Sequence, residues 1–143
     1  ATILANALRE LKPRLYSHTT ASRTDAVNRL FTHKGTVLIS PSLKEGVSLP
    51  EDSCRFIIVA KLPFPYLGSP QIKARMESDA GKRWYTWKTT CDLVQMTGRG
   101  NRSDVDTCSV YIKDGAFKRL FHQTKRYLPV YWLADLIDVK HDL

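Results

Sequence analysis

The chain alternates short apolar runs with stretches in which apolar residues recur at helical spacing. Runs rich in β-branched residues predict buried strands at residues 36–40, 55–60 and 107–113, with a shorter strand at 14–17. Helical spacing and helix-ending residues predict helices at residues 2–11, 22–33, 70–81, 84–100 and 130–138, and residues 116–127 also carry a helix.

This order of elements predicts βαβ units, and therefore an α/β fold with a mostly parallel sheet covered by helices on both faces. We interpret residues 1–143 as a single domain, because the length suits one hydrophobic core. Ligands of such sheets gather at the carboxyl ends of the strands. The loops that follow the strands, at residues 18–22, 40–50, 61–70 and 113–116, are therefore candidate binding regions.

One predicted helix carries an unusual polar face. Gln95, Gly98, Arg99 and Arg102 are spaced at i, i+3, i+4 and i+7, which would place them on one side of a continuous helix. Guanidinium groups are well suited to phosphate oxygens. The spacing alone leaves two interpretations open: a phosphate-binding face, or a surface helix with two solvated arginines.

The overall charge favours a polyanionic partner. The formal net charge is +8 over 143 residues, and the composition of 43% hydrophobic and 25% charged residues is that of a globular protein. Cys54, Cys91 and Cys108 are odd in number and far apart, which argues against a disulfide scaffold or a cysteine-based metal site and favours a reducing, intracellular compartment. We predict no metal site, membrane span or signal peptide; cytoplasm, nucleoid and nucleus are not distinguished.

The loop after the strand at 36–40 contains Glu45 and Gly46. A glycine there lets a phosphate or another backbone approach closely, although a plain connecting turn has the same composition.

Two segments in this order resemble a known family. Residues 45–50 (EGVSLP) are similar to motif V of superfamily 2 helicases, and residues 95–102 (QMTGRGNR) are similar to their motif VI, Q-x-x-G-R-x-x-R. Residues 61–65 (KLPFP) and 102–106 resemble the DinG- and XPD-like subgroup of DNA helicases. The resemblance covers nearly the whole chain and implies the second, C-terminal RecA-like motor domain, a three-layer α/β structure.

The resemblance also implies roles for individual residues. ATP and Mg²⁺ would lie between two motor domains, with Arg102 as the arginine finger, Arg99 as a second phosphate contact and Gln95 sensing the terminal phosphate. The loop that links the bound nucleotide to DNA binding would contain Glu45 and Gly46. Gly98 would leave the motif VI surface without a projecting side chain at its position. Many relatives have Asp where this chain has Ser48, whose hydroxyl can exchange hydrogen bonds but carries no charge.

Half of an ATPase site is missing from the sequence. The phosphate-binding pattern G-x-x-x-x-G-K-[ST] and the acidic Mg²⁺-binding box do not occur; Gly81-Lys82 is followed by Arg83. The chain also starts without Met. We therefore expect a fragment that lacks its N-terminal motor domain, is inactive alone and carries no iron–sulphur cluster.

Several segments combine cations with hydroxyls or aromatic rings and are candidates for binding single-stranded or forked DNA. Each also has a structural interpretation, such as helix capping, core packing or a solvated face. The candidate contacts are His18, Thr19, Thr20, Arg23, Lys44, Arg83 and Trp84.

Three functions remain open at this point. The first is the second motor domain of an ATP-dependent DNA helicase. The main alternative is a non-catalytic nucleic-acid-binding or interaction module that has kept the fold. The third is a nucleotide-binding regulator unrelated to helicases.

Overall fold

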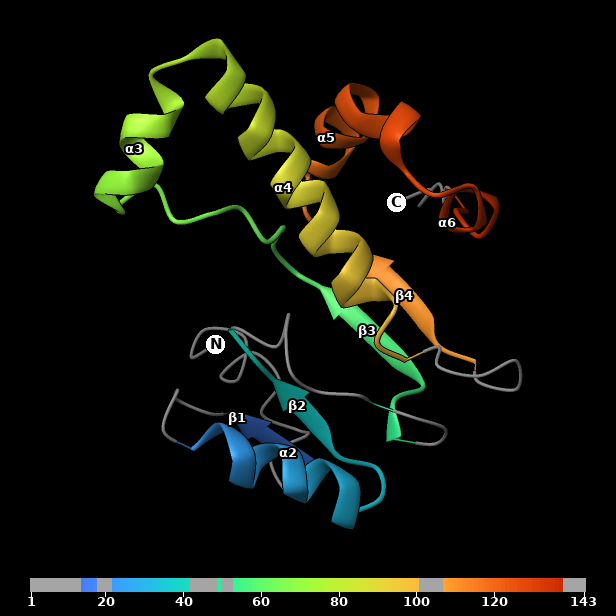
Figure 1. Ribbon diagram of the computed structural model, residues 1–143. Helices are drawn as coiled ribbons and strands as arrows, with labels where there is room; N and C mark the ends of the chain where they lie inside the picture. Colours follow the sequence, from blue (N-terminus) through green and yellow to red (C-terminus); the bar gives the residue numbers. More distant parts are fainter. Residues whose placement is uncertain (1–13, 18–21, 42–48, 50–52, 101–106, 138–143) are drawn as a thin grey trace.

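The computed structural model describes residues 14–17, 22–41, 49, 53–100 and 107–137 (Figure 1). The predicted helix at 2–11 lies outside these residues. The described elements follow one another as β1 (Leu15–Ser17), α2 (Arg23–Thr32), β2 (Val37–Ile39), β3 (Phe56–Val59), α3 (Pro70–Met76), α4 (Asp79–Thr97), β4 (Ser109–Ile112), α5 (Phe117–Thr124), the 3₁₀ turn η3 (Lys125–Tyr127) and α6 (Val130–Ala134).

The strands pair in parallel, as the order of elements predicts. β1 pairs with β2 in the register Leu15↔Val37, and β3 pairs with β4 in the register Phe56↔Ser109. This confirms the α/β class. Within the described part of the chain, however, the strands form two two-stranded sheets and not one continuous sheet. Each strand has only three or four residues, so each pair depends on the helices beside it (Figure 1).

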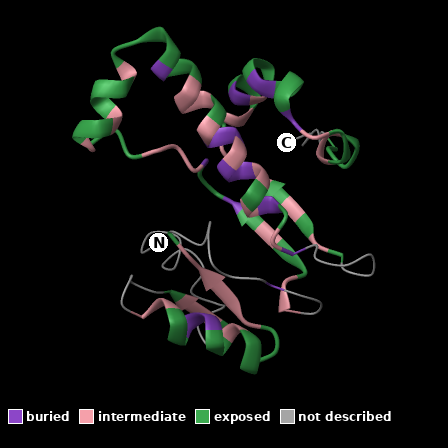
Figure 2. Cartoon of the chain, viewed as in Figure 1, coloured by how far each residue is buried: buried purple, intermediate pink, exposed green. Residues whose placement is uncertain are grey.

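The main core lies between the β3–β4 sheet and the helices α4 and α5. Val59, Leu62, Leu93 and Leu120 form its buried centre, and Leu93 is only 1% exposed. Burial of a leucine side chain stabilises a fold by roughly 1.5–3 kcal/mol. The buried residues of α4 lie mostly in its second half, next to the sheet (Figure 2). This half leads directly into motif VI.

The predicted helix at 70–81 is in fact two helices joined by a corner. Helix α3 ends at Met76, and the hydroxyl of Ser78 accepts a hydrogen bond from the Gly81 N–H at 3.0 Å, which caps the start of α4. A Cβ on Gly81 would lie 1.6 Å from the carbonyl oxygen of Arg75. The predicted helices at 70–81 and 84–100 placed the break after residue 81, whereas in the structure it lies at residues 77–78.

A second glycine lies in the turn between α2 and β2. The helix ends at Thr32 with His33 as its C-cap, and Gly35 follows with φ of +72°, a conformation that glycine adopts without strain. None of the helices in the described ranges is long and apolar enough to span a membrane.

Candidate functional site

The candidate motif VI begins on α4 and leaves it. The helix ends at Thr97, and Gly98 (φ −77°, ψ 6°) caps it, with its N–H donating to the Val94 carbonyl at 3.1 Å. Gly98 and Arg99 therefore lie in a turn. The prediction of one continuous helical face through Arg99 and Arg102 is wrong for the part that is described, because two glycines with low helix propensity flank Arg99. Arg102 lies outside the described residues.

The last turn of α4 separates inward from outward side chains. Met96 packs against the core and Thr97 is buried, whereas Gln95 and Gly98 are exposed and Arg99 is half-buried. Gln95 is therefore exposed one turn before Arg99, whose guanidinium has its Nε buried. Amide and guanidinium donors on an exposed helix end can bind an anion supplied by another domain.

An indole from α6 supports this turn. Trp132 donates from Nε1 to the Thr97 hydroxyl at 2.9 Å, and that hydroxyl donates to the Val94 carbonyl at 3.1 Å. Neither Trp132 nor Thr97 is among the site residues predicted from the sequence. Their contact spans 35 positions, so helical periodicity within α4 could not show it.

The turn after α4 lies at the edge where β3 and β4 begin. A Cβ on Gly100 would lie 2.3 Å from the Cys108 sulfur and 3.3 Å from the Cys54 carbonyl oxygen, and these cysteines precede β4 and β3. The expectation that binding loops gather at the carboxyl ends of the strands therefore does not extend to motif VI. A helix that runs back across a parallel sheet delivers its C-terminus to the opposite edge.

The carboxyl edge of β3 and β4 is organised by Asp114. Its carboxylate accepts hydrogen bonds from the N–H groups of Leu62 at 2.8 Å and Ala116 at 2.9 Å. These two bonds lower the pKa of Asp114 below its usual 3.8, because they stabilise the ionised form. The predicted loops at 61–70 and 113–116 thus meet, as their positions after parallel strands require.

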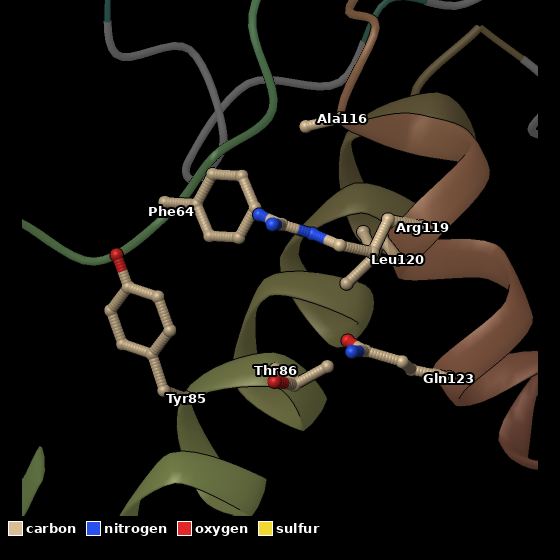
Figure 3. Close-up of a pocket in the computed structure, with 7 residues that line it drawn as sticks. All are labelled: Phe64, Tyr85, Thr86, Ala116, Arg119, Leu120 and Gln123. Atoms are coloured by element: carbon tan, nitrogen blue, oxygen red, sulfur yellow. The ribbon is translucent and has the colours of Figure 1, made fainter.

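A hollow of about 220 Å³ opens between α4 and α5 (Figure 3). The Phe64 and Tyr85 rings stack with centroids 5.6 Å apart, and the Tyr85 hydroxyl donates to the Pro65 carbonyl at 3.0 Å. Burial raises the pKa of Tyr85, so this hydroxyl stays a donor at neutral pH. The side chain of Arg119 points across the hollow toward Phe64 (Figure 3).

A second hollow of about 220 Å³ lies beside motif VI and is mainly apolar. Gln95 contributes to its wall, and Trp87 and Tyr127 are 48% and 55% exposed. The remaining lining residues are Thr90, Cys91, Val94 and Pro129.

The candidate DNA contacts are only partly described. His18, Thr19, Thr20 and Lys44 lie outside the described residues, as do the motif V residues Glu45, Gly46 and Ser48. Arg23 is the first residue of α2, and Arg83 is exposed on α4. Trp84 is half-buried, and the guanidinium of Arg75 lies 4.2 Å from its ring centroid. One face of the Trp84 ring is therefore covered by a cation from α3.

A buried carboxylate lies one turn before Gln95. Asp92 is 1% exposed and pairs with the Lys88 ammonium on the preceding turn of α4. This pair is not among the predicted site residues, although opposite charges at i and i+4 in the sequence favour such a pair. The Lys88 ammonium compensates the charge of the buried Asp92 carboxylate, which lies in the core beside the motif VI turn.

No group of three or more His, Cys, Asp or Glu residues within the described ranges is arranged to hold a metal ion.

Comparison with models of protein families gives a match that spans nearly the whole chain. A search of curated proteins found no match. The model of the family described as helicase C-terminal domain matches residues 2–134. The matched range includes both candidate motifs and every element from β1 to α6. The chain therefore belongs to the helicase C-terminal domain family.

Proposed function

We propose that this chain is the second motor domain of an ATP-dependent DNA helicase of superfamily 2, DinG- and XPD-like subgroup, with a role in DNA repair. The observation that carries the proposal is the match to the helicase C-terminal domain family, together with the motif Q-x-x-G-R-x-x-R at residues 95–102. A domain that only binds nucleic acid has no need for this set of donors.

In this proposal, the chain supplies half of an ATP site. ATP and Mg²⁺ are held mainly by a first motor domain of the same protein, and Arg102 stabilises the charge that develops on the transferred phosphoryl group. Arg99 makes a second phosphate contact, and Gln95 senses the terminal phosphate. The exposed amide of Gln95 and the polar turn at Gly98 and Arg99 fit an anionic ligand.

Gly98 has a steric role in the proposed site. Its exposed position leaves the space between Gln95 and Arg99 without a side chain. A Cβ there would lie 3.4 Å from the nearest atom, the Val94 oxygen, which is an ordinary contact. Gly98→Ala therefore changes the outer surface of motif VI with little disturbance of packing.

The loop with Glu45, Gly46 and Ser48 would couple the nucleotide bound at the ATP site to the affinity for DNA. The DNA track would use backbone contacts from His18, Thr19, Thr20, Arg23 and Lys44. Arg83 and Trp84 would extend this track along α4. The net charge of +8 supports a polyanionic partner, either single-stranded or forked DNA.

The decisive experiment measures DNA-stimulated ATP hydrolysis by the protein that contains both motor domains. We expect Arg102→Ala to lower turnover on the order of a thousandfold, the effect of losing an arginine finger. Arg29→Ala is the matched control, because Arg29 is exposed on α2 and stacks on the Tyr16 ring, outside the motif VI turn and the hollow beside it.

Gly98→Ala gives an independent test of the same surface. We expect a lower rate with unchanged thermal stability. Wild-type turnover in a folded Arg102→Ala protein would overturn the finger assignment. If DNA binding persisted without any ATP hydrolysis in the wild type, the non-catalytic binding module would be the better description.

A further inference from the structure

We propose that Cys54 and Cys108 form a reversible intramolecular disulfide, a modification site at the edge where β3 and β4 begin. The two cysteines are 54 positions apart in sequence, yet their sulfur atoms lie 3.9 Å apart. Each is a half-buried free thiol. Cys108 directly precedes β4, and Cys54 lies two residues before β3. The parallel pairing of Phe56 with Ser109 holds the two cysteines beside each other.

The surroundings give the two thiols different chemistry. Burial raises the pKa of Cys54 to about 12, and the neighbouring Cys108 adds to this shift. Burial also raises the pKa of Cys108, but the contact with Cys54 and the positive charge of Arg55 oppose the shift. Because Arg55 is tethered to Thr107 and favours the ionised form of the adjacent Cys108, we assign Cys108 as the attacking thiol. Thiolates and not thiols are the nucleophiles in such reactions.

Arg55 is held in position to exert this effect. Its guanidinium Nη1 donates to the hydroxyl of Thr107 at 3.0 Å and to the Thr107 carbonyl at 3.5 Å. Thr107 immediately precedes Cys108, so the cation is tethered next to the reacting sulfur.

A hydroperoxide is a sufficient oxidant for the step. The Cys108 thiolate attacks the peroxide, the O–O bond breaks, and Cys108 becomes a sulfenic acid while one water or alcohol leaves after protonation. The Cys54 sulfur then attacks the Cys108 sulfur, the S–O bond breaks and water leaves, with the Cys54 proton going to that water. Two thiols lose two electrons, and one peroxide is reduced. A dithiol reductant reverses the bond by exchange.

The site is packed against the segment that carries motif VI. A Cβ on Gly100 would lie 2.3 Å from the Cys108 sulfur and 2.5 Å from its Cβ, so Cys108 fills the space beside Gly100. Disulfide formation draws the two sulfurs to about 2.05 Å, which moves them toward each other and changes the surface on which Gly100 rests. Oxidation is thereby coupled to the turn that follows Arg99.

The test uses the 143-residue chain in its folded state. The protein is treated with hydrogen peroxide, alkylated, digested without reduction and examined by mass spectrometry. We expect one cross-linked peptide pair that joins Cys54 to Cys108, with a mass two hydrogens below that of the two reduced peptides. Cys91 should be recovered as an alkylated cysteine. The same treatment in concentrated urea should give a mixture of pairings, because the geometry is lost.

Variants and pH complete the experiment. Cys91→Ser should retain the cross-link, and Cys108→Ser should abolish it. Below the pKa of Cys108, the initial rate should rise about tenfold per pH unit, following the thiolate fraction. The proposal is overturned if folded wild-type protein keeps both thiols alkylatable after oxidation, or if its cross-links involve Cys91 or a second chain.

Discussion

The indole of Trp132 on α6 donates a hydrogen bond to the hydroxyl of Thr97, the last residue of α4, over 2.9 Å. Thr97 is 6% exposed, and the motif VI turn begins directly after it. A residue near the C-terminal end of the described chain thus fixes the end of the helix from which Gln95 projects. The position of the candidate phosphate-binding turn depends on the docking of α6.

We predict that Trp132→Phe lowers the free energy of unfolding by about 1 kcal/mol. The phenyl ring keeps much of the packing against Phe117, but the buried Thr97 hydroxyl loses a donor. Urea denaturation monitored by circular dichroism measures the change. Trp87→Phe is the control, because Trp87 is 48% exposed and its loss should cost less. Equal effects of the two substitutions would contradict the role given to the indole N–H.

Gly81→Ala should destabilise the corner between α3 and α4 by about 1–3 kcal/mol, as overpacking does. The added Cβ would collide with the Arg75 carbonyl, a backbone atom that moves only if α3 shifts. Gly115→Ala is the matched control, because nothing lies within 4 Å of its Cβ position. Thermal melting of the two variants gives the comparison, and a Gly81→Ala melting temperature equal to that of the control would refute the close contact.

Asp114 should make the free energy of unfolding depend on pH in the acidic range. Its pKa is lower in the folded chain than the usual 3.8, so its stabilising effect is fully present above that value. The effect is lost as the pH falls through the lowered folded pKa, because the carboxyl group must then be protonated. Asp114→Asn should reduce stability at pH 7 by about 1 kcal/mol through weaker acceptance from Leu62 and Ala116.

The acid dependence itself distinguishes this account from a general loss of packing. The stability difference between wild type and Asp114→Asn should shrink as the pH is lowered below 3.8, since wild-type Asp114 then also becomes neutral. Asp135→Asn, at an exposed position after α6, serves as the control in urea titrations at several pH values. A constant difference across this range would count against the charged hydrogen bonds.

The isolated chain should bind single-stranded DNA weakly and with strong dependence on salt, because its net charge is +8 and phosphate contacts release counterions. Fluorescence anisotropy with a labelled oligonucleotide at several salt concentrations measures the slope. Arg83→Ala should reduce the slope by about one, the expectation for one lost phosphate contact. Arg126→Ala is the exposed control, and an affinity that does not change with salt would argue against electrostatic binding.

The regular elements were largely predictable because their signals are local. The apolar runs that predicted strands at 36–40, 55–60 and 107–113 enclose β2, β3 and β4, and the helix predicted at 22–33 encloses α2. Parallel pairing also followed from the alternation of strands and helices. Periodicity misplaced the break between α3 and α4, which depends on the Ser78 cap and on the close packing of Gly81 against the Arg75 carbonyl.

The contacts around the site could not be predicted for a similar reason. Cysteine spacing argued against a disulfide scaffold, but it could not show that the strand pairing brings Cys54 next to Cys108. Asp114 was predicted only as part of a turn, whereas its hydrogen bond to the Leu62 N–H joins segments 52 positions apart. The roles that the motifs assign to Gln95, Arg99 and Arg102 remain predictions.

The close approach of Gly100 to Cys108 also has a consequence for how these two positions can vary in evolution. A side chain at position 100 would occupy the volume that the Cys108 sulfur fills, so the two residues share one fixed space. Among related chains, a residue larger than glycine at position 100 should therefore occur together with a smaller residue than cysteine at position 108. The amino edge of β3 and β4 thus limits the sequences that the family can use beside motif VI.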